Sequence, residues 1–407
     1  MDAFFIHFTL LMTKNVHNVE FQPNWDNAIN DFDAMNLNEN VLMGIYRNNI
    51  ISPTNVQELA IQPIVEGKDT FVVAKEWSGK TVAFCIGILN SIDPELHKTQ
   101  SIILLPTHGI AYRTYNTMKS HAMRLNISIE LFADCYDIKE DIEKANKEPS
   151  IIIGTPGRIL DLIKENKLKF ESLKIICIKG FEFYLDDLKT IELIFQSIPK
   201  DSQKLIFTTY FDYKFQRFID KFMNEPIKIK AELQPTKQNV KYYCIPYSCR
   251  TNKLDLIEYL LSTRYFGKRY IIFVNTIETI EKIWEFYNKN NCPALYIHSG
   301  FTQIQKEQAL NEIEYARVLI CDDSVLEYID LEDFYFIINY DFSESLRISQ
   351  RCLCLTNRLK NECIVYNIVT TPEEENHLYR LLSKFNIKRL QINQELMSNI
   401  FYRNQVK

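Results

Sequence analysis

Glycine is scarce in this sequence, which has 10 glycines among 407 residues. Average usage of roughly 7% would give about 28 in a chain of this length. Loops that wrap a phosphate group need glycine, because the backbone must approach the ligand closely and can adopt a positive φ. Few positions of this chain can therefore serve in such a loop.

Cysteine pairs with metal-binding spacing are also absent. None of the ten cysteines forms a CxxC pair, and the two that lie nearest in sequence, Cys352 and Cys354, are separated by a single residue. Zinc-finger spacing is thereby excluded. Cys177, Cys321 and Cys363 lie in apolar runs, where free thiols are common. We predict no metal site and a reducing, intracellular location, in the cytoplasm or the nucleus.

The chain has neither an excess of positive charge nor a long hydrophobic run. Its 47 Lys and Arg against 52 Asp and Glu give a net charge of −5. A nucleic-acid partner would therefore be held by a local groove rather than by bulk charge. The apolar run at residues 3–12 is too short to span a bilayer, and Asp2 precedes it where a signal peptide has basic residues. We expect no membrane association and interpret residues 1–30 as an N-terminal extension.

Short apolar runs alternate with amphipathic stretches along the rest of the chain. The runs are continuous, without strict polar alternation, which is typical of strands buried on both faces of a sheet. Helix-like stretches such as 80–92 and 158–166 separate them. We predict strands at 70–74, 101–106, 150–154, 173–178 and 204–208, and then at 270–275, 294–298, 317–322, 334–340 and 362–369.

This alternation predicts an α/β fold with parallel sheets covered by helices. The stretch 225–239 interrupts the pattern with two prolines and several polar residues, which favours a linker. We place that linker at residues 230–240. It separates a first domain, residues 31–229, from a second domain, residues 241–407.

Gly79-Lys80-Thr81 lies between a predicted strand and a predicted helix. A nucleotide polyphosphate is bound by backbone N–H groups at a helix N-terminus, a lysine ammonium and a hydroxyl on Mg²⁺. The three residues match the end of a phosphate-binding loop. An ordinary helix start with a surface lysine and threonine is the alternative interpretation.

Further short motifs follow one another across both predicted domains. They are Phe32-Asp33-Ala34-Met35, Pro53-Thr54-Asn55-Val56-Gln57, Pro106-Thr107, Thr155-Pro156-Gly157-Arg158, Phe273-Val274-Asn275-Thr276, Asp323 with Asp330, and Ile338-Asn339-Tyr340-Asp341. In order and spacing, over about residues 30–402, the chain resembles the DEAD-box RNA helicases, most closely the translation initiation factor 4A subgroup. The resemblance implies two tandem RecA-like domains, each a parallel sheet flanked by helices, with ATP and RNA each bridging both domains.

The resemblance also implies roles for individual residues. Lys80 and Arg358 would be the remnants of the catalytic set, Arg358 as one of the family's two arginine fingers. The nucleotide-binding residues would be Pro53, Gln57, Gly79, Lys80, Thr81, Asp330 and Arg358. The RNA-binding residues would be Pro106, Thr107, Thr155, Gly157, Arg158 and Thr276.

The chain departs from the family pattern at the catalytic positions. The Asp-Glu-Ala-Asp motif is replaced by Lys179-Gly180-Phe181-Glu182. In the family the first acid orients Mg²⁺ and the second polarises the attacking water, and lysine and glycine can do neither. Trp77 stands where the phosphate loop has a glycine, and Leu355 where the family has its other arginine finger.

The coupling and RNA-binding motifs have changed as well. The family's Ser-Ala-Thr motif is Thr208-Thr209-Tyr210, and its Gly-Gly motif is Asp134-Cys135. The Arg-Glu that should follow Pro106-Thr107 is His108-Gly109, and a later Arg-Gly is Glu327-Tyr328.

Several residues admit more than one interpretation. Thr155 and Arg158 hold an RNA phosphate or only begin a helix. Lys179 could bind phosphate in place of Mg²⁺, and Glu182, Asp186 or Asp187 could replace the lost acids. We predict that Trp77 folds into the vacant nucleotide site, because a packed indole buries about 150–250 Å².

We therefore hypothesise a pseudo-helicase, a monomeric scaffold that kept the fold and lost ATP hydrolysis. Its partners would be RNA, bound weakly or within a complex, and proteins of translation or RNA-processing complexes. No cofactor is assigned; ATP and Mg²⁺ are implied if nucleotide binding survives. Two alternatives stay open. One is an active ATP-dependent RNA helicase with unconventional catalytic residues, and the other is a nucleotide-binding switch that does not hydrolyse.

Overall fold

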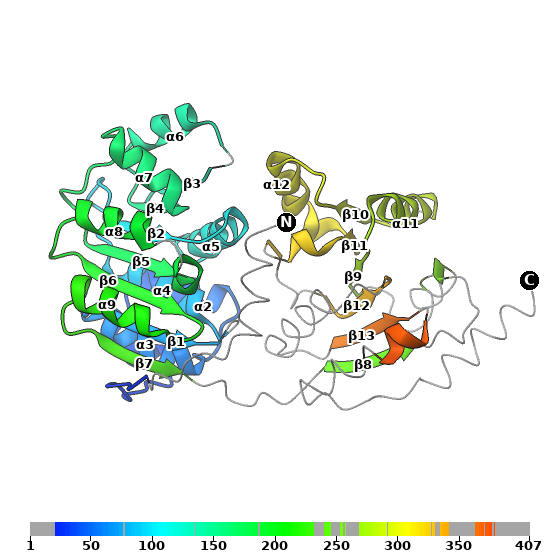
Figure 1. Ribbon diagram of the computed structural model, residues 1–407, viewed down its shortest axis with the longest axis horizontal. Coiled ribbons are helices and arrows are strands. Elements are labelled where there is room, and N and C mark those ends of the chain that lie inside the picture. The colour runs from blue at the N-terminus through cyan, green and yellow to red at the C-terminus, as the bar shows by residue number, and fades with distance from the viewer. Residues whose placement is uncertain are drawn as a thin grey trace, which may run out of the picture. The chain divides into compact units, whose positions relative to one another are not determined.

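The chain divides into two compact units, Met1–Gln234 and Pro235–Lys407, which are drawn in Figure 1. The computed structural model describes residues 21–75, 78–134, 136–185, 188–231, 240–245, 253–254, 257, 268–290, 292–326, 328–329, 334–341, 363–369, 371–376 and 378.

The first unit is built on a seven-stranded parallel sheet with the order β3-β4-β2-β5-β6-β1-β7. Parallel strands need crossover connections, and helices provide them here. The strands are β1 Thr70–Ala74, β2 Ser101–Leu104, β3 Ile129–Phe132, β4 Ile151–Gly154, β5 Ile175–Lys179, β6 Gln203–Thr208 and β7 Ile227–Ala231. The flanking helices are η1 Phe32–Met35, α2 Glu39–Arg47, α3 Asn55–Val65, α4 Lys80–Ser91, α5 His108–His121, α6 Ile138–Ala145, α7 Pro156–Lys164, η2 Phe181–Tyr184, α8 Leu188–Ser197 and α9 Tyr213–Phe222.

A cluster of phenylalanines forms part of the core of this unit. Helix α9 places Phe215, Phe218 and Phe222 on one face, at the spacing of an amphipathic helix. The Phe181 ring lies 4.9 Å from the Phe215 ring and 4.8 Å from the Phe218 ring, centroid to centroid. Phe181 is fully buried. The third position of the replaced acidic motif has therefore become a core residue.

Residues 21–30, the described part of the segment interpreted as an extension, belong to the first unit and are hydrogen-bonded to its strands and helices. The backbone N–H of Asn24 donates to the carbonyl of Lys228 on β7 at 3.0 Å, and the Lys228 N–H donates to Asn24 Oδ1 at 2.6 Å. The indole N–H of Trp25 donates to the Leu59 carbonyl at 3.0 Å. The two bonds with Asn24 satisfy backbone groups of the edge strand β7, and the Trp25 bond joins the segment to α3.

The second unit contains a six-stranded parallel sheet with the order β10-β11-β9-β12-β13-β8. Its strands are β8 Val240–Ile245, β9 Tyr270–Phe273, β10 Ala294–Ile297, β11 Val318–Cys321, β12 Phe336–Asn339 and β13 Cys363–Ile368. The helices with stated bounds are α11 Ile277–Lys289, α12 Gln303–Asn311, η3 Ile313–Tyr315 and η4 Asp323–Val325. Within the described part of the chain, no helix is long and apolar enough to cross a membrane.

The predicted fold class is confirmed: each unit is a parallel sheet flanked by helices. All ten predicted strands occur, with ends that coincide with the predicted ones or differ by one or two residues; β5, for example, runs from Ile175 to Lys179. Three strands were not predicted, and all three are edge strands: β3, β7 and β8. These three strands contain polar side chains, as in Ile227-Lys228-Ile229-Lys230, and so lack the continuous apolar run on which the prediction relied. The predicted linker overlaps the end of β7 at Ala231 and the start of β8 at Val240.

Candidate functional site

The phosphate-loop remnant joins β1 to α4. Gly79 is the N-cap residue of α4 and has φ +98°, a conformation that glycine adopts without strain. A Cβ at this position would lie 2.5 Å from Thr54 Oγ1 and 2.8 Å from Gln57 Nε2. Both the backbone angle and the surrounding atoms therefore require glycine here.

Thr54 and Gln57 hold this loop from the neighbouring helix α3. Thr54 Oγ1 donates to the Ser78 carbonyl at 2.9 Å, and Gln57 Nε2 donates to the Gly79 carbonyl at 3.4 Å. Gln57 Oε1 in turn accepts from the Thr54 backbone N–H at 2.9 Å. The predicted adenine-binding residue Gln57 is buried, as is Pro53. The two predicted nucleotide-binding motifs thus contact each other directly.

Lys80 begins α4 and is 6% exposed. Its ammonium donates to the carbonyl of Ala74 and, at 2.7 Å, to the carbonyl of Lys75. Both carbonyls lie at the carboxyl end of β1, so the ammonium lies at the edge of the sheet where ligands bind in open α/β folds. Thr81 follows it and is half-buried. Glu76 and Trp77 lie outside the described residues, and the predicted inward position of Trp77 stays a prediction.

The replaced acidic motif begins at the end of β5. Gly180 follows the strand with φ +76°, and a Cβ there would lie 3.0 Å from the Phe183 ring and 3.1 Å from Pro106 Cγ. Pro106 belongs to a predicted RNA motif, so the two motifs are in contact. Any side chain at Gly180 would combine backbone strain with crowding.

Glu182 is the next carboxylate along the chain, and it is 2% exposed. One oxygen accepts from Thr208 Oγ1 at 2.8 Å. The other accepts from the Thr209 hydroxyl at 2.5 Å and from the Thr209 backbone N–H at 3.2 Å. One oxygen therefore binds the last residue of β6 and the other binds the residue that follows it. Asp186 and Asp187, the other candidate replacements, lie outside the described residues.

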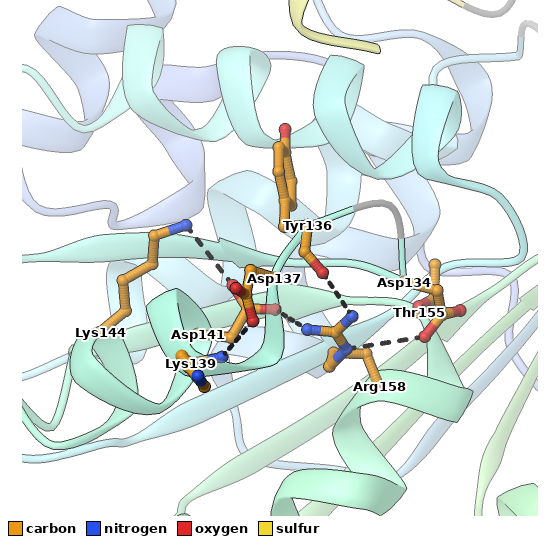
Figure 2. A network of polar contacts seen from close by, with 8 residues as sticks. All are labelled: Asp134, Tyr136, Asp137, Lys139, Asp141, Lys144, Thr155 and Arg158. Carbon is orange, nitrogen blue, oxygen red and sulfur yellow. Dashed lines mark hydrogen bonds and ion pairs between the residues drawn. The ribbon is translucent and has the colours of Figure 1, made fainter. Parts of the chain in front are cut away.

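The predicted RNA motif at the start of α7 is engaged by acidic side chains of the same unit (Figure 2). Arg158 is 6% exposed. Its guanidinium donates to Asp141 Oδ2 at 2.6 Å and to the Tyr136 carbonyl at 2.8 Å. Thr155 Oγ1 donates to Asp134 Oδ2 at 3.0 Å. Thr155 occupies the N-cap position of α7, but its side chain makes no capping hydrogen bond.

Asp141 is the buried member of this network, with no exposed surface on its side chain. Burial raises the pKa of the Asp141 carboxyl, whereas the charges of Lys144 and Arg158 oppose that shift. Lys144 Nζ lies 3.5 Å from Asp141 Oδ1. Removing Arg158 would leave a buried carboxylate with poor compensation, so Arg158 has a structural role whatever else it binds.

In the second unit, the predicted RNA-binding residue Thr276 is exposed at the carboxyl end of β9. It caps α11 by accepting from the Thr279 backbone N–H at 3.3 Å. Beside it, the Asn275 N–H donates to Asp341 Oδ2 at 3.2 Å, and Lys253 Nζ lies 3.0 Å from Asp341 Oδ1. The predicted motif ends at β9 and β12 are therefore in contact. Asp330 and Arg358 lie outside the described residues.

Asp322 lies at the end of β11 in the same unit. It accepts from the Ser299 N–H at 2.7 Å and from the Ser324 hydroxyl at 2.5 Å. Burial raises the pKa of its carboxyl, but hydrogen bonds from Ser324 and Ser299 outweigh that effect and hold the pKa below its ordinary value. Its neighbour Asp323, part of a family landmark, is buried.

Comparison with known proteins decides the ancestry. Residues 54–217 match the DEAD/DEAH box helicase family, and residues 252–359 match the helicase conserved C-terminal domain. The chain belongs to the DEAD-box helicase family. It is 26% identical over 370 residues to the ATP-dependent RNA helicase eIF4A of Mycosarcoma maydis, and the aligned region covers 88% of each chain. It is 28% identical over 371 residues to eIF4A of Meyerozyma guilliermondii, covering 89% of this chain and 92% of the relative.

Solved DEAD-box structures share the fold of this chain. A variant of S. cerevisiae Dbp5 bound to Gle1 and IP6 has a TM-score of 0.74 at 19% identity, covering 93% of this chain and 99% of that chain. S. cerevisiae Dbp5 bound to RNA and ADP BeF3 has a TM-score of 0.67 at 20% identity, covering 91% and 99%. A DEAD box protein from Methanococcus jannaschii has a TM-score of 0.57 at 22% identity, covering 90% and 100%.

The DEAD-box ancestry implies ATP with Mg²⁺, and the residues of the β5 end do not fit the metal. Mg²⁺ is bound through carboxylates together with substrate phosphates. Here the two relevant positions carry Lys179 and Gly180, and both oxygens of Glu182 are engaged by Thr208 and Thr209. The end of β5 therefore does not provide the carboxylate ligands that Mg²⁺ would need.

Two residues of the site in this DEAD-box protein, Asp134 and Asp141, are not predicted from the sequence as partners of Thr155 and Arg158. Asp134 occupies the position of a family glycine, and Asp141 belongs to no family motif. A signal for Asp141 existed, because Ile138, Asp141, Ile142 and Ala145 fall on one face of α6 at helical spacing. A single carboxylate on an apolar face predicts a buried ion pair, and Arg158 is its partner.

Proposed function

We propose that this DEAD-box protein of the initiation factor 4A type is a pseudo-helicase, a scaffold in which ATP hydrolysis has been lost. One observation carries the proposal. At the end of β5, where the family places its metal-orienting and water-polarising acids, the chain has Lys179 and Gly180. The following carboxylate, Glu182, is buried with three hydrogen bonds to Thr208 and Thr209.

The size of the expected loss follows from the chemistry. Removing a general acid or base costs typically 10²–10⁴-fold in rate. An arginine finger contributes about 10³–10⁵-fold, and one of the two positions carries Leu355. Effects of residues that act as a unit do not add, but each loss alone is large. Reversal by a single substitution is not expected, because the backbone at Gly180 has φ +76°.

RNA binding is the activity that we expect to persist. The relative Dbp5 is known bound to RNA, and Thr155, Gly157 and Arg158 keep the family's RNA-backbone motif. Without ATP-driven closure of two domains on one strand, we expect binding that is weak, steeply salt-dependent and indifferent to ATP. A monomer that works with proteins of translation or RNA-processing complexes is consistent with such weak binding.

The test is RNA-stimulated phosphate release by the purified full chain, with an active initiation factor 4A as positive control. We expect release at the level of the Lys80→Ala variant, with and without oligouridylate. Circular dichroism establishes that the variant is folded. Phosphate release well above that of Lys80→Ala would contradict the scaffold proposal and support the alternative of an active helicase.

A nucleotide-binding switch without hydrolysis is the second candidate, and one observation favours it. The carboxyl end of the loop is fixed by the protein itself: Gly79 has φ +98°, and Thr54 and Gln57 hold the carbonyls of Ser78 and Gly79. Restraint of a binding segment by its own protein lowers the entropy cost of binding. Titration with a fluorescent ATP analogue separates the candidates: saturable binding that Lys80→Ala abolishes supports the switch, and its absence supports the scaffold. Trp77→Gly, which restores the family residue, tests whether the indole blocks nucleotide.

A further inference from the structure

The carboxylate of Asp134 lies at the start of α7, among the groups predicted to hold an RNA phosphate. Its Oδ2 accepts from Thr155 Oγ1 at 3.0 Å, and its Oδ1 lies 3.8 Å from Arg158 Nε. A Cβ built on Gly157 would lie 3.5 Å from both carboxylate oxygens. Figure 2 shows Asp134 and Thr155 together beside the Arg158 side chain.

This arrangement supplies what a phosphate group would use. A hydroxyl, a guanidinium and the N-terminus of a helix are the groups that bind phosphate oxygens, and α7 is nine residues long. The Thr155 hydroxyl makes no capping bond within α7 and donates to Asp134 instead. Two of the three predicted phosphate donors are thus directed at an internal anion.

Asp134 is not needed to keep Arg158 in place. Asp141, which is fully buried, accepts from Arg158 at 2.6 Å, and the Tyr136 carbonyl accepts at 2.8 Å. The Asp134 side chain is 62% exposed, so its ion pair at 3.8 Å is screened by water and weak. The structural role therefore falls to Asp141, and Asp134 can be displaced without unfolding the site.

We propose that Asp134 is an internal competitor for an RNA phosphate at the start of α7 and sets the RNA affinity of the first unit. It acts in two ways. It engages the Thr155 hydroxyl and one side of the Arg158 guanidinium, and its negative charge repels a phosphate that approaches them. The inference rests on the proposed RNA binding through Thr155, Gly157 and Arg158.

The experiment compares Asp134→Asn and Asp134→Gly with a matched control, Asp137→Asn. Asp137 is an exposed aspartate of the same loop, and its side chain accepts from the Lys139 N–H as the N-cap of α6, a role that asparagine also fills. The control removes the same charge without touching Thr155 or Arg158. Binding of fluorescein-labelled oligouridylate to the full chain is followed by anisotropy between about 50 and 200 mM salt.

We expect both Asp134 variants to bind RNA about fivefold more tightly than the unmodified chain, the upper range for an exposed charge pair. The salt dependence should steepen by about 0.7 in the logarithmic slope, the value for one added phosphate contact on a single strand. Asp137→Asn should change affinity much less and leave the slope unaltered. Combining Thr155→Val with Asp134→Gly should remove most of the gain, because the hydroxyl freed in the single variant is then absent.

Two results would overturn the inference, and they can be told apart. If the chain binds RNA and Thr155→Val weakens that binding, but the Asp134 variants match Asp137→Asn, then only the competitor role is wrong. If the chain and every variant fail to bind RNA, the proposed RNA binding is wrong as well. Melting temperatures of the variants, measured alongside, exclude misfolding as the cause of either result.

Discussion

Two regions at the carboxyl edge of the first sheet differ in what they keep. At the end of β1, the phosphate-loop remnant retains Gly79 and Lys80 in a defined geometry, held by Thr54 and Gln57. At the end of β5, the acids are gone and Phe181 has joined the core. The comparison shows that the retained residues have internal roles: Gly79 supplies a positive φ, and the Lys80 ammonium binds the carbonyls at the end of β1. A motif residue with such a role is not by itself a sign of catalysis.

The largest expected effect tests the β5 region. Phe181→Ala restores the family residue at that position, yet it removes a fully buried ring from between Phe215 and Phe218. We expect the free energy of unfolding to fall by about 3–5 kcal/mol, as for other buried aromatic truncations. Phe222→Ala, at the half-buried edge of the same cluster, should cost clearly less. Equal losses in urea denaturation would mean that Phe181 is not a central core residue.

A second variant separates structural from catalytic use of the neighbouring acid. Glu182→Ala leaves the Thr209 N–H and the Thr209 hydroxyl without their acceptor, whereas the Thr208 hydroxyl keeps the Tyr210 carbonyl at 2.9 Å. The change should cost about 2–3 kcal/mol of stability. Glu182→Gln keeps one acceptor oxygen and should cost less. If Glu182→Ala is as stable as the unmodified chain, the structural role of Glu182 is wrong, because the carboxylate would then be free to act in catalysis.

Glycine substitutions sharpen the comparison at the phosphate loop. Gly67 and Gly79 both have positive φ, but a Cβ at Gly67 meets nothing within 4 Å, whereas at Gly79 it meets Thr54 and Gln57. Gly67→Ala should therefore cost only the backbone term, about 1 kcal/mol. Gly79→Ala should cost about twice that, within the usual range for strained and crowded sites. Similar losses would indicate that Thr54 and Gln57 do not restrain the loop.

The smallest effect comes from a buried histidine outside both regions. His121 is 2% exposed, and burial lowers the pKa of its imidazole, although a hydrogen bond with the Thr117 carbonyl opposes that. A depressed pKa in the folded state means that its contribution to stability is present above the unfolded pKa of about 6.5. That contribution is lost as the pH falls through the folded pKa. His121→Gln should flatten the fall in stability between neutral and mildly acidic pH, whereas the exposed His97→Gln should not.

The sequence was sufficient for the fold because strands such as Phe71-Val72-Val73 are buried on both faces and are therefore uninterrupted by polar residues. Edge strands such as β7 escaped prediction for the opposite reason. At the site, residue identity predicted the lost acids, since Lys179 and Gly180 cannot act as carboxylates in any geometry. It could not predict that Arg158 pairs with Asp141 or that Thr155 donates to Asp134. Those contacts join segments 17 to 21 residues apart, and they depend on how α6 and α7 pack.

Single-turnover hydrolysis tests the central claim most directly. The reaction contains trace radiolabelled ATP, Mg²⁺, saturating oligouridylate and a large excess of the full chain. Because each ATP molecule is hydrolysed at most once under these conditions, slow product release cannot hide a weak activity. Because both acids at the end of β5 are lost, we predict that ATP is hydrolysed no faster than in buffer alone. The Lys80→Ala variant should give the same time course of hydrolysis. RNA-dependent exponential conversion that Lys80→Ala abolishes would contradict the account and make this chain an active helicase.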